Sequence, residues 1–244
     1  RPFPRLFRRP PKRRWAAPFT FRLRCPPADM LVRVLGLRDY EEIWELQRRL
    51  AADRAADRVP DTLLLVEHHP VFTRGRSSRQ PIPSSLPYPL HTVERGGDIT
   101  YHGPGQLVGY PILHLGRLGL GVRDYLRALE TVLIEALAAW DLEAERLRGF
   151  TGVWHKGRKL ASIGVAVKNR VSFHGFALNV NCDLEPFARI HPCRLEPEQI
   201  SSMSGALGRQ VEADQVVGGL AQAFLGAFAG PAREKSHSPM FRAP

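Results

Sequence analysis

From Met30 onward, hydrophobic and polar positions alternate between two periods, and this pattern predicts a mixture of strands and helices. Short runs of β-branched and aliphatic residues predict strands, whereas apolar residues spaced three and four apart predict helices. The first helix is expected to begin after Asp39, an N-cap residue type, and to end before Pro60. The other predicted helices cover 122–140 and 211–228, and the predicted strands cover 31–35, 63–66, 107–115, 152–154, 159–167 and 171–180.

Two short polar turns, 155–158 and 168–170, separate the last three predicted strands and indicate antiparallel hairpins. A stretch rich in Arg, Ser and Pro, 74–90, is typical of a surface loop. Strands joined partly by hairpins and partly by helices predict an α/β (or α+β) fold, with a mixed β-sheet and flanking helices. We therefore expect a single domain over 30–230, followed by a frayed polar tail over 231–244.

The net charge of the 244-residue chain is +11, which by itself favours nucleic acid or an anionic membrane as a partner. Residues 1–29 contain nine basic residues and one acidic residue, so this segment carries eight of the eleven charges. The remaining residues, 30–244, are only mildly basic. A basic nucleic-acid-binding protein is therefore kept as an alternative, but we expect neither nucleic acid nor a membrane as partner.

The first 29 residues also contain seven of the 21 prolines, which prevents a long helix there. Three interpretations follow: sequence upstream of a native start at Met30, a disordered basic arm, or a mitochondrial transit peptide. A transit peptide is Arg-rich and poor in acids, as this segment is, but it is also rich in Ser, and no Ser occurs here. We expect 1–29 to be a disordered tail.

Three cysteines, Cys25, Cys182 and Cys193, form no CxxC pair, and this sparse, odd count favours a reducing compartment. We expect a cytoplasmic protein, with a mitochondrial setting as the alternative. A zinc site built from His174, Cys182, His191 and Cys193 is disfavoured, because their spacing lacks the short paired steps of such sites. We expect no metal and no other cofactor.

The most distinctive segment combines glycines with polar residues. Four glycines in twelve positions require sharp turns or the close approach of another group. The spacing fits neither a P-loop, since no Gly-Lys-Ser/Thr follows, nor a GxGxxG dinucleotide fingerprint. A tight connection between two strands is the alternative to a binding site. The segment reads Arg95-Gly96-Gly97-Asp98-Ile99-Thr100-Tyr101-His102-Gly103-Pro104-Gly105-Gln106.

A second glycine-bearing region lies in two strands that we expect to pair. Small residues at Ala161, Gly164, Gly175 and Ala177 leave a groove where larger side chains would otherwise fill space. A long, thin acyl chain would suit such a groove. Close packing of the strands, or a bulge with nothing bound, is the alternative.

Cys193 lies in a predicted loop beside the cationic Arg194. Because a thiolate is the nucleophilic form and positive charge favours it, Cys193 is a candidate nucleophile, with Lys159 and His102 as candidate partners. A small buried residue without chemistry is the alternative for Cys193, and it is the preferred interpretation of Cys182.

Together these segments resemble the octanoyltransferases of lipoate biosynthesis, also called lipoyl(octanoyl) transferases. The resemblance rests first on the run from Arg95 to Pro111, which is similar to the signature of that family. It extends from about Met30 to Phe228 and leaves the basic tail outside. Three later blocks match in order: Lys159-Leu160-Ala161-Ser162-Ile163-Gly164, Phe173-His174-Gly175-Phe176-Ala177-Leu178-Asn179 and His191-Pro192-Cys193.

The resemblance implies transfer of an octanoyl group from its thioester on acyl carrier protein to a lysine of a lipoyl domain. The implied acceptors are the lipoyl domains of 2-oxoacid dehydrogenase E2 subunits and the H protein of glycine cleavage. The implied fold is the one that biotin and lipoate protein ligases share. An ATP-dependent lipoate or biotin protein ligase, which needs no cysteine nucleophile, is the alternative.

The resemblance also implies roles for single residues. Cys193 would form an acyl-thioester intermediate, and Lys159 would stabilise the thiolate and later act as a base. The sequence departs from the family at Arg194, where Gly usually follows the cysteine; a position that requires positive φ would be strained by Arg. The implied substrate pocket consists of Arg95, Gly96, Gly97, Asp98, Ile99, Thr100, Tyr101, His102, Ser162, Ile163, Gly164, Gly175, Phe176 and Ala177.

Overall fold

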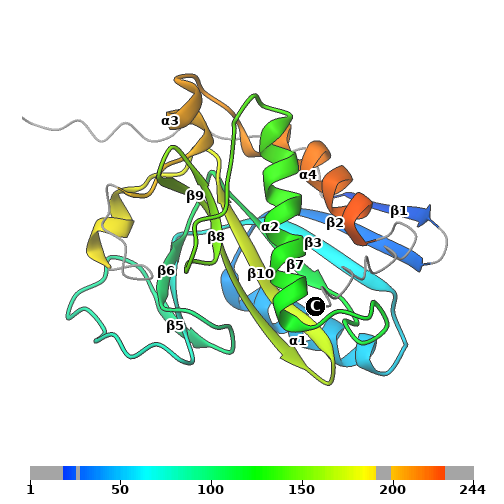
Figure 1. Cartoon of the computed structure of the whole chain (residues 1–244). Helices are drawn as coiled ribbons and strands as arrows, with labels where there is room; N and C mark the ends of the chain where they lie inside the picture. The colour runs from blue at the N-terminus through cyan, green and yellow to red at the C-terminus, as the bar shows by residue number, and fades with distance from the viewer. Residues whose placement is uncertain (1–18, 26–27, 191–198, 229–244) are drawn as a thin grey trace, which may run out of the picture.

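The computed structural model of the chain describes residues 19–25, 28–190 and 199–228, which form two β-sheets and the helices packed against them (Figure 1). The helices are α1 (Tyr40–Ala55), α2 (Val122–Ala138), α3 (Met203–Leu207) and α4 (Ala213–Phe228), with a 3₁₀ helix η1 (Glu185–Arg189). The strands are β1 (Phe19–Cys25), β2 (Ala28–Arg38), β3 (Asp61–His68), β4 (Val71–Gly75), β5 (Leu90–Val93), β6 (Ile99–His102), β7 (Gln106–Ile112), β8 (Gly152–His155), β9 (Arg158–Lys168) and β10 (Val171–Asn179).

The larger sheet has the strand order β1-β2-β3-β7-β10-β9-β8. Strands β2 and β3 are parallel, with α1 as the connection between them, and the other neighbouring pairs are antiparallel. The two predicted hairpins are present as β8–β9 and β9–β10. The predicted α/β architecture with a mixed sheet and flanking helices is therefore confirmed.

Helices cover both faces of the larger sheet. In Figure 1, α2 and α4 cross the near face, and α1 lies behind the sheet. Strand β3 shows why its sequence is an unbroken apolar run: Leu63 and Leu65 pack in the α2–α4 core, whereas Leu64 and Val66 pack on the α1 side with Ile43. A strand that is buried on both faces needs apolar side chains at every position.

The smaller sheet, in the order β5-β4-β6, holds the glycine-rich segment next to the larger sheet. Strand β4 follows β3 after a two-residue step, and β6 leads through 103–105 into β7. The small sheet is thus tied to two adjacent strands of the large sheet, β3 and β7. This connection places the residues between β5 and β6 against β9 and β10.

The expectation of disorder over 1–29 is wrong for part of that segment. Phe19–Cys25 forms strand β1, which pairs antiparallel with β2, and β2 itself begins at Ala28. Phe, Phe, Leu and Cys alternate there with Thr, Arg and Arg, which is a strand pattern that the proline content of the segment obscured. Residues 1–18 and the expected tail from 229 onward lie outside the described residues.

Several short elements were not predicted. Strands β5 and β6 have four residues each, and β4 has five, which is too short for a periodic signal. Helix α3 is also short and is capped by Ser202, whose side chain accepts a hydrogen bond from the Gly205 N–H at 3.1 Å. Asp39 occupies the N-cap position of α1, as expected, but its side chain makes no capping hydrogen bond.

We expect the buried Asp61 to be a main determinant of stability. One of its carboxylate oxygens accepts hydrogen bonds from Arg54 Nε at 2.6 Å and from the His114 N–H at 2.8 Å, which joins α1 to the end of β7. Asp61→Asn should lower the free energy of unfolding by about 3 kcal/mol, because it removes the buried carboxylate charge beside Arg54 and leaves that cation with only the exposed Asp57 as an ionic partner. Urea denaturation measures this. The matched control Asp53→Asn breaks an exposed pair with Arg58 and should cost less than about 0.5 kcal/mol; equal losses in both variants would contradict the prediction.

Candidate active site

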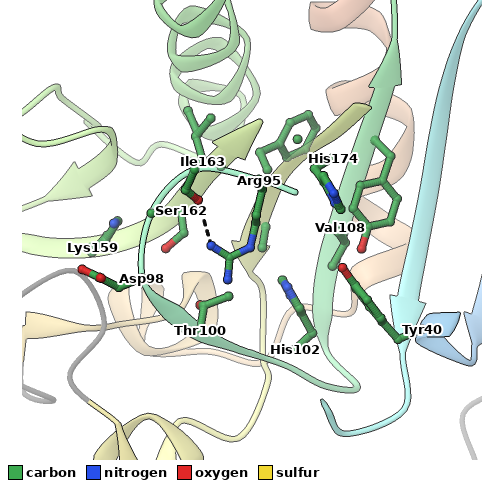
Figure 2. Close-up of a pocket in the computed structure, with 17 residues that line it drawn as sticks. Tyr40, Arg95, Asp98, Thr100, His102, Val108, Lys159, Ser162, Ile163 and His174 are labelled. Carbon is green, nitrogen blue, oxygen red and sulfur yellow. Dashed lines mark hydrogen bonds between the residues drawn. The ribbon is translucent and has the colours of Figure 1, made fainter. Parts of the chain in front are cut away.

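An open cavity of about 50 Å³ lies where the glycine-rich segment crosses β9 and β10 near the start of α1 (Figure 2). Figure 2 shows Lys159 and Asp98 at one end of the cavity and Tyr40 and His174 at the other. The lining residues are Tyr40, Arg95, Gly96, Gly97, Asp98, Thr100, His102, Val108, Tyr110, Lys159, Ser162, Ile163, Gly164, His174, Gly175, Phe176 and Ala177.

The cavity brings together Lys159 and twelve of the fourteen residues expected in the substrate pocket. Ile99 and Tyr101 do not line it, which corrects the expectation for these two. They lie on β6, where successive side chains face opposite sides of the sheet. Thr100 and His102 therefore face the cavity, whereas Ile99 and Tyr101 pack in a hydrophobic cluster of the small sheet.

Four lining residues were missing from the expected pocket: Tyr40, Val108, Tyr110 and His174. Tyr40 fits the apolar face of α1, and Val108 and Tyr110 fit the apolar pattern of β7, so the pattern indicated core positions. His174 stands inside one of the blocks that match the octanoyltransferase family. In a regular strand, however, its side chain would point toward α2. Its positive φ of 55° reverses that direction, and no pattern in the sequence indicates this conformation.

Arg95 fixes the glycine-rich segment over the larger sheet. Its guanidinium is almost fully buried and donates from Nη2 to the Thr73 carbonyl oxygen at 2.7 Å and to Thr73 Oγ1 at 2.8 Å. Nη1 donates to the Gly96 carbonyl oxygen at 2.9 Å. The next peptide continues the attachment, since the Gly96 N–H donates to the Val165 carbonyl oxygen of β9 at 3.0 Å. Residues 95–98 therefore form the roof of the cavity. This segment is attached to β4 through Arg95 and to β9 through Gly96.

The glycines of β9 and β10 both permit the close approach of other protein groups. A Cβ on Gly164 would lie 3.1 Å from Arg95 Cδ and from the Gly96 carbonyl oxygen, so this glycine leaves room for the roof of the cavity. A Cβ on Gly175 would lie 2.1 Å from the carbonyl oxygen of Gly109 on β7. Gly175 thus permits close packing of strands, and only part of the expected groove is open space.

A buried chain of hydrogen bonds runs below the cavity. Gln106 Nε2 donates to Asn179 Oδ1 at 2.9 Å, so Gln106 Oε1 is left to accept from His102 Nδ1 at 2.6 Å. His102 Nε2 then accepts from the hydroxyl of Thr73, at 3.4 Å, and that oxygen accepts from Arg95. These partners assign His102 as a neutral ring protonated on Nδ1.

His68 is fixed in the same way beside it. Its Nδ1 donates to the Arg38 carbonyl oxygen at 3.2 Å, and its Nε2 accepts from the Tyr110 hydroxyl at 2.8 Å. Burial, which removes the solvation of an imidazolium, lowers the pKa of His68 to about 4 and that of His102 to about 3. Both rings are therefore neutral at physiological pH, and they stabilise the buried layer below the cavity as hydrogen-bonding groups.

Lys159 is the cationic side chain at the end of the cavity farthest from His174. It is 5% exposed, and its Nζ lies 5.1 Å from the centre of the Trp154 ring, a cation–π geometry. Its carbonyl oxygen accepts a hydrogen bond from the Ser201 N–H at 3.0 Å, and Ile200 pairs with it as a parallel bridge. The chain that follows residue 199 thus returns directly beside Lys159.

The candidate nucleophile Cys193 and its neighbour Arg194 lie outside the described residues. The described residues on either side, Ile190 and Ile200, are buried in one cluster with Tyr101. Cys182 is buried, and its Sγ–H donates to Asn179 Oδ1 at 3.5 Å, as expected for a structural thiol.

Two further observations concern metals and membranes. Among the described residues, no three His, Cys, Asp or Glu side chains gather as they would around a metal ion. Of the four residues weighed for zinc, His174 and Cys182 bond to other partners, and His191 and Cys193 lie outside the described residues. Within the described part of the chain, every helix is too short or too polar to cross a membrane.

Sequence comparison gives a consistent family. The lipoyl protein ligase A/B catalytic domain matches residues 39–225. An octanoyltransferase of Geobacter sulfurreducens is 48% identical over 195 residues, which cover 79% of this chain and 82% of that protein. An octanoyltransferase of Mycobacterium leprae is 44% identical over 217 residues, covering 85% and 92% of the two chains.

Comparison with solved structures gives the same fold. A lipoate-protein ligase A bound with ATP aligns with a TM-score of 0.62 at 16% identity, over 84% of this chain and 87% of that chain. The biotin protein ligase of Aquifex aeolicus, in complex with biotin and ATP, aligns with a TM-score of 0.50 at 14% identity, over 82% and 69%. The expected fold of lipoate and biotin protein ligases is therefore confirmed.

The buried neutral histidines predict how stability depends on pH. In the unfolded chain a histidine gains a proton below about pH 6.5, whereas folded His68 stays neutral down to about pH 4. The unfolded state binds more protons across this window, so stability is full above pH 6.5 and falls on acidification. His68→Gln should reduce the slope near pH 5 by about one proton, or about 1.4 kcal/mol per pH unit. Urea denaturation at several pH values measures the slope; an unchanged slope in the variant would contradict this account.

Proposed function

The chain belongs to the octanoyltransferases of the lipoyl protein ligase A/B catalytic-domain family, and from this premise we propose that it moves octanoyl from acyl carrier protein to a lipoyl-domain lysine through a thioester on Cys193. It is an acyltransferase of lipoate biosynthesis, as its relatives are. The donor, the covalent intermediate and the acceptors named below are the proposed part. The observation that carries the proposal is the position of Lys159 at one end of a covered cavity whose walls consist largely of small and apolar residues.

The cavity suits a thin acyl chain. Its walls include Val108, Ile163, Phe176 and Ala177. Burying methylene groups against such walls is worth about 0.8 kcal/mol for each CH₂. The hydrophobic effect alone therefore gives an octanoyl chain substantial binding energy in this cavity.

The position of Lys159 supports its pairing with Cys193. The chain leaves the described residues at Ile190 and returns by Ile200, which pairs with Lys159 itself. Both flanking isoleucines are buried in one cluster. Because the described chain resumes beside the lysine, we propose that residues 191–198 present the Cys193 thiol to the Lys159 ammonium.

The proposed reaction needs only these two groups and the thioester. The Cys193 thiolate attacks the carbonyl carbon of the donor thioester, an S–C bond forms, and the donor thiolate leaves with a proton from the Lys159 ammonium. The neutral amine of the acceptor lysine then attacks the acyl-enzyme and gives a proton to Lys159, and Cys193 leaves as a thiolate. One thioester is exchanged for another before the amide forms, so the scheme consumes no nucleotide.

The proposed partners are those that the resemblance to the octanoyltransferases implies. The donor is octanoyl-acyl carrier protein, an acidic protein class that suits the mildly basic residues 30–244. The proposed acceptors are the lipoyl domains of 2-oxoacid dehydrogenase E2 subunits and the glycine cleavage H protein. A reducing setting such as the cytoplasm would keep the Cys193 thiol available.

A covalent intermediate on Cys193 can be tested by mass. Incubation with octanoyl-acyl carrier protein should add one octanoyl group to the wild-type chain, and Cys193→Ala should show neither the adduct nor octanoylation of an acceptor lipoyl domain. The matched control Cys182→Ala removes the buried thiol and should still form the adduct. Intact-mass spectrometry measures both. Full activity of Cys193→Ala that depends on ATP would instead identify a ligase.

We expect Lys159→Gln to slow octanoyl transfer by at least about 100-fold, because it removes the group that moves protons in both steps. The acyl-enzyme should also form more slowly when no acceptor is present. Lys156→Gln, on the exposed turn between β8 and β9, is the matched control and should retain the wild-type rate. Equal rates for Lys159→Gln and the wild type would exclude the proposed role.

A further inference from the structure

His174 departs from the backbone geometry of the strand around it. It lies within β10, opposite Val165 of β9, with a φ of 55°. Its odd-numbered neighbours face α1, since Phe173 packs near Leu50, whereas Phe176 packs in the α2–α4 core. Regular alternation would direct His174 toward α2. The positive φ instead turns its imidazole to the α1 side and into the cavity.

Helix α1 and the residue before Arg95 hold this orientation. The His174 N–H donates to Gln47 Oε1 of α1 at 2.8 Å, and His174 Nε2 lies 3.2 Å from Glu94 Oε2. Glu94 in turn accepts hydrogen bonds from Trp44 Nε1 at 2.8 Å and Arg48 Nε at 2.9 Å. A non-glycine residue in this conformation persists only where its surroundings determine it, and such residues concentrate at functional sites.

The His174–Glu94 pair lies between two cavities. A second, larger cavity of about 700 Å³ is lined by Glu94, by Phe173 and by residues of β9 beyond Gly164. Arg95 and Gly96 line both cavities, whereas His174 lines only the first and Glu94 only the second. The imidazole and its carboxylate partner therefore form part of the wall that separates the two spaces.

Strand β9 gives the distance from the reacting end to this wall. Val165, the partner of His174, is six positions after Lys159, which corresponds to at most about 20 Å at 3.3 Å per residue because β9 is irregular next to Lys159. An extended octanoyl chain is about 10 Å long, and the lysine side chain adds about 6 Å. An octanoyl group whose carbonyl is within reach of Lys159 would therefore end close to the His174 ring.

We propose that His174, held by Glu94, is a specificity-determining residue that limits the acyl chain to about eight carbons by closing the cavity toward the second space. This inference rests on the proposed function, since it takes the first cavity as the acyl site. A chain longer by two to four carbons would meet the imidazole. Without the ring, the same chain would continue into the larger cavity.

The test compares octanoyl-, decanoyl- and dodecanoyl-acyl carrier protein as donors for wild type and for His174→Gly. Glycine adopts the positive φ without strain and removes the ring. We expect the ratio of kcat/KM for dodecanoyl over octanoyl to rise at least about tenfold. Asparagine also tolerates a positive φ and is shorter than histidine, so His174→Asn should raise the same ratio by a smaller factor. If the glycine variant does not fold, the asparagine variant provides the test. Asp141→Gly, at an exposed turn with a φ of 58°, is the matched control and should keep the wild-type ratio.

A second variant separates this inference from the function beneath it. Ala177→Leu fills the middle of the cavity and should favour butanoyl over octanoyl at least about tenfold if the acyl chain lies there. One outcome is that Ala177→Leu shifts the preference to butanoyl while both His174 variants keep the wild-type ratio of dodecanoyl to octanoyl. In that case His174 does not limit the chain length and the proposal is overturned, whereas the assignment of the first cavity as the acyl site is retained. If the wild type transfers no acyl group from any donor, the proposed function fails instead.

Discussion

The hydrogen bonds between Arg95 and Thr73 hold the two sheets of the protein in one arrangement. Thr73 belongs to the small sheet, and the residue after Arg95 bonds to β9 of the large sheet. A guanidinium with several fixed donors can set both the distance and the angle between two segments. The cavity is the space left under that connection, so its shape depends on a charged group that is almost fully buried.

The rest of the site is built to keep this arrangement rigid. Asn179, Gln106, His102 and Thr73 form a continuous chain of donors and acceptors that ends at Arg95. Buried polar groups are stable only when each has a partner, and here the partners come from both sheets. Changing one member would therefore disturb groups on the other side of the cavity.

Long periodic segments made most of the large sheet predictable, together with α1, α2 and α4. Strands β4 to β6 were missed because four or five residues give no usable period, and β1 was missed because its alternation stands among prolines. The site residues came from the resemblance, and the structure brings most of them together around Lys159. His174 could not be placed from sequence, because its direction depends on a single backbone angle.

The hydrogen bonds below the cavity also involve the buried thiol of Cys182. Asn179 Oδ1 accepts from both Gln106 and Cys182, so this oxygen joins the Cys182 thiol to the chain of hydrogen bonds below the cavity. A thiol that is donating its hydrogen is a poor nucleophile. Because Cys182 is also buried, its modification by a thiol reagent would require this end of β10 to open, and the rate of modification would report on the integrity of the hydrogen bonds below the cavity.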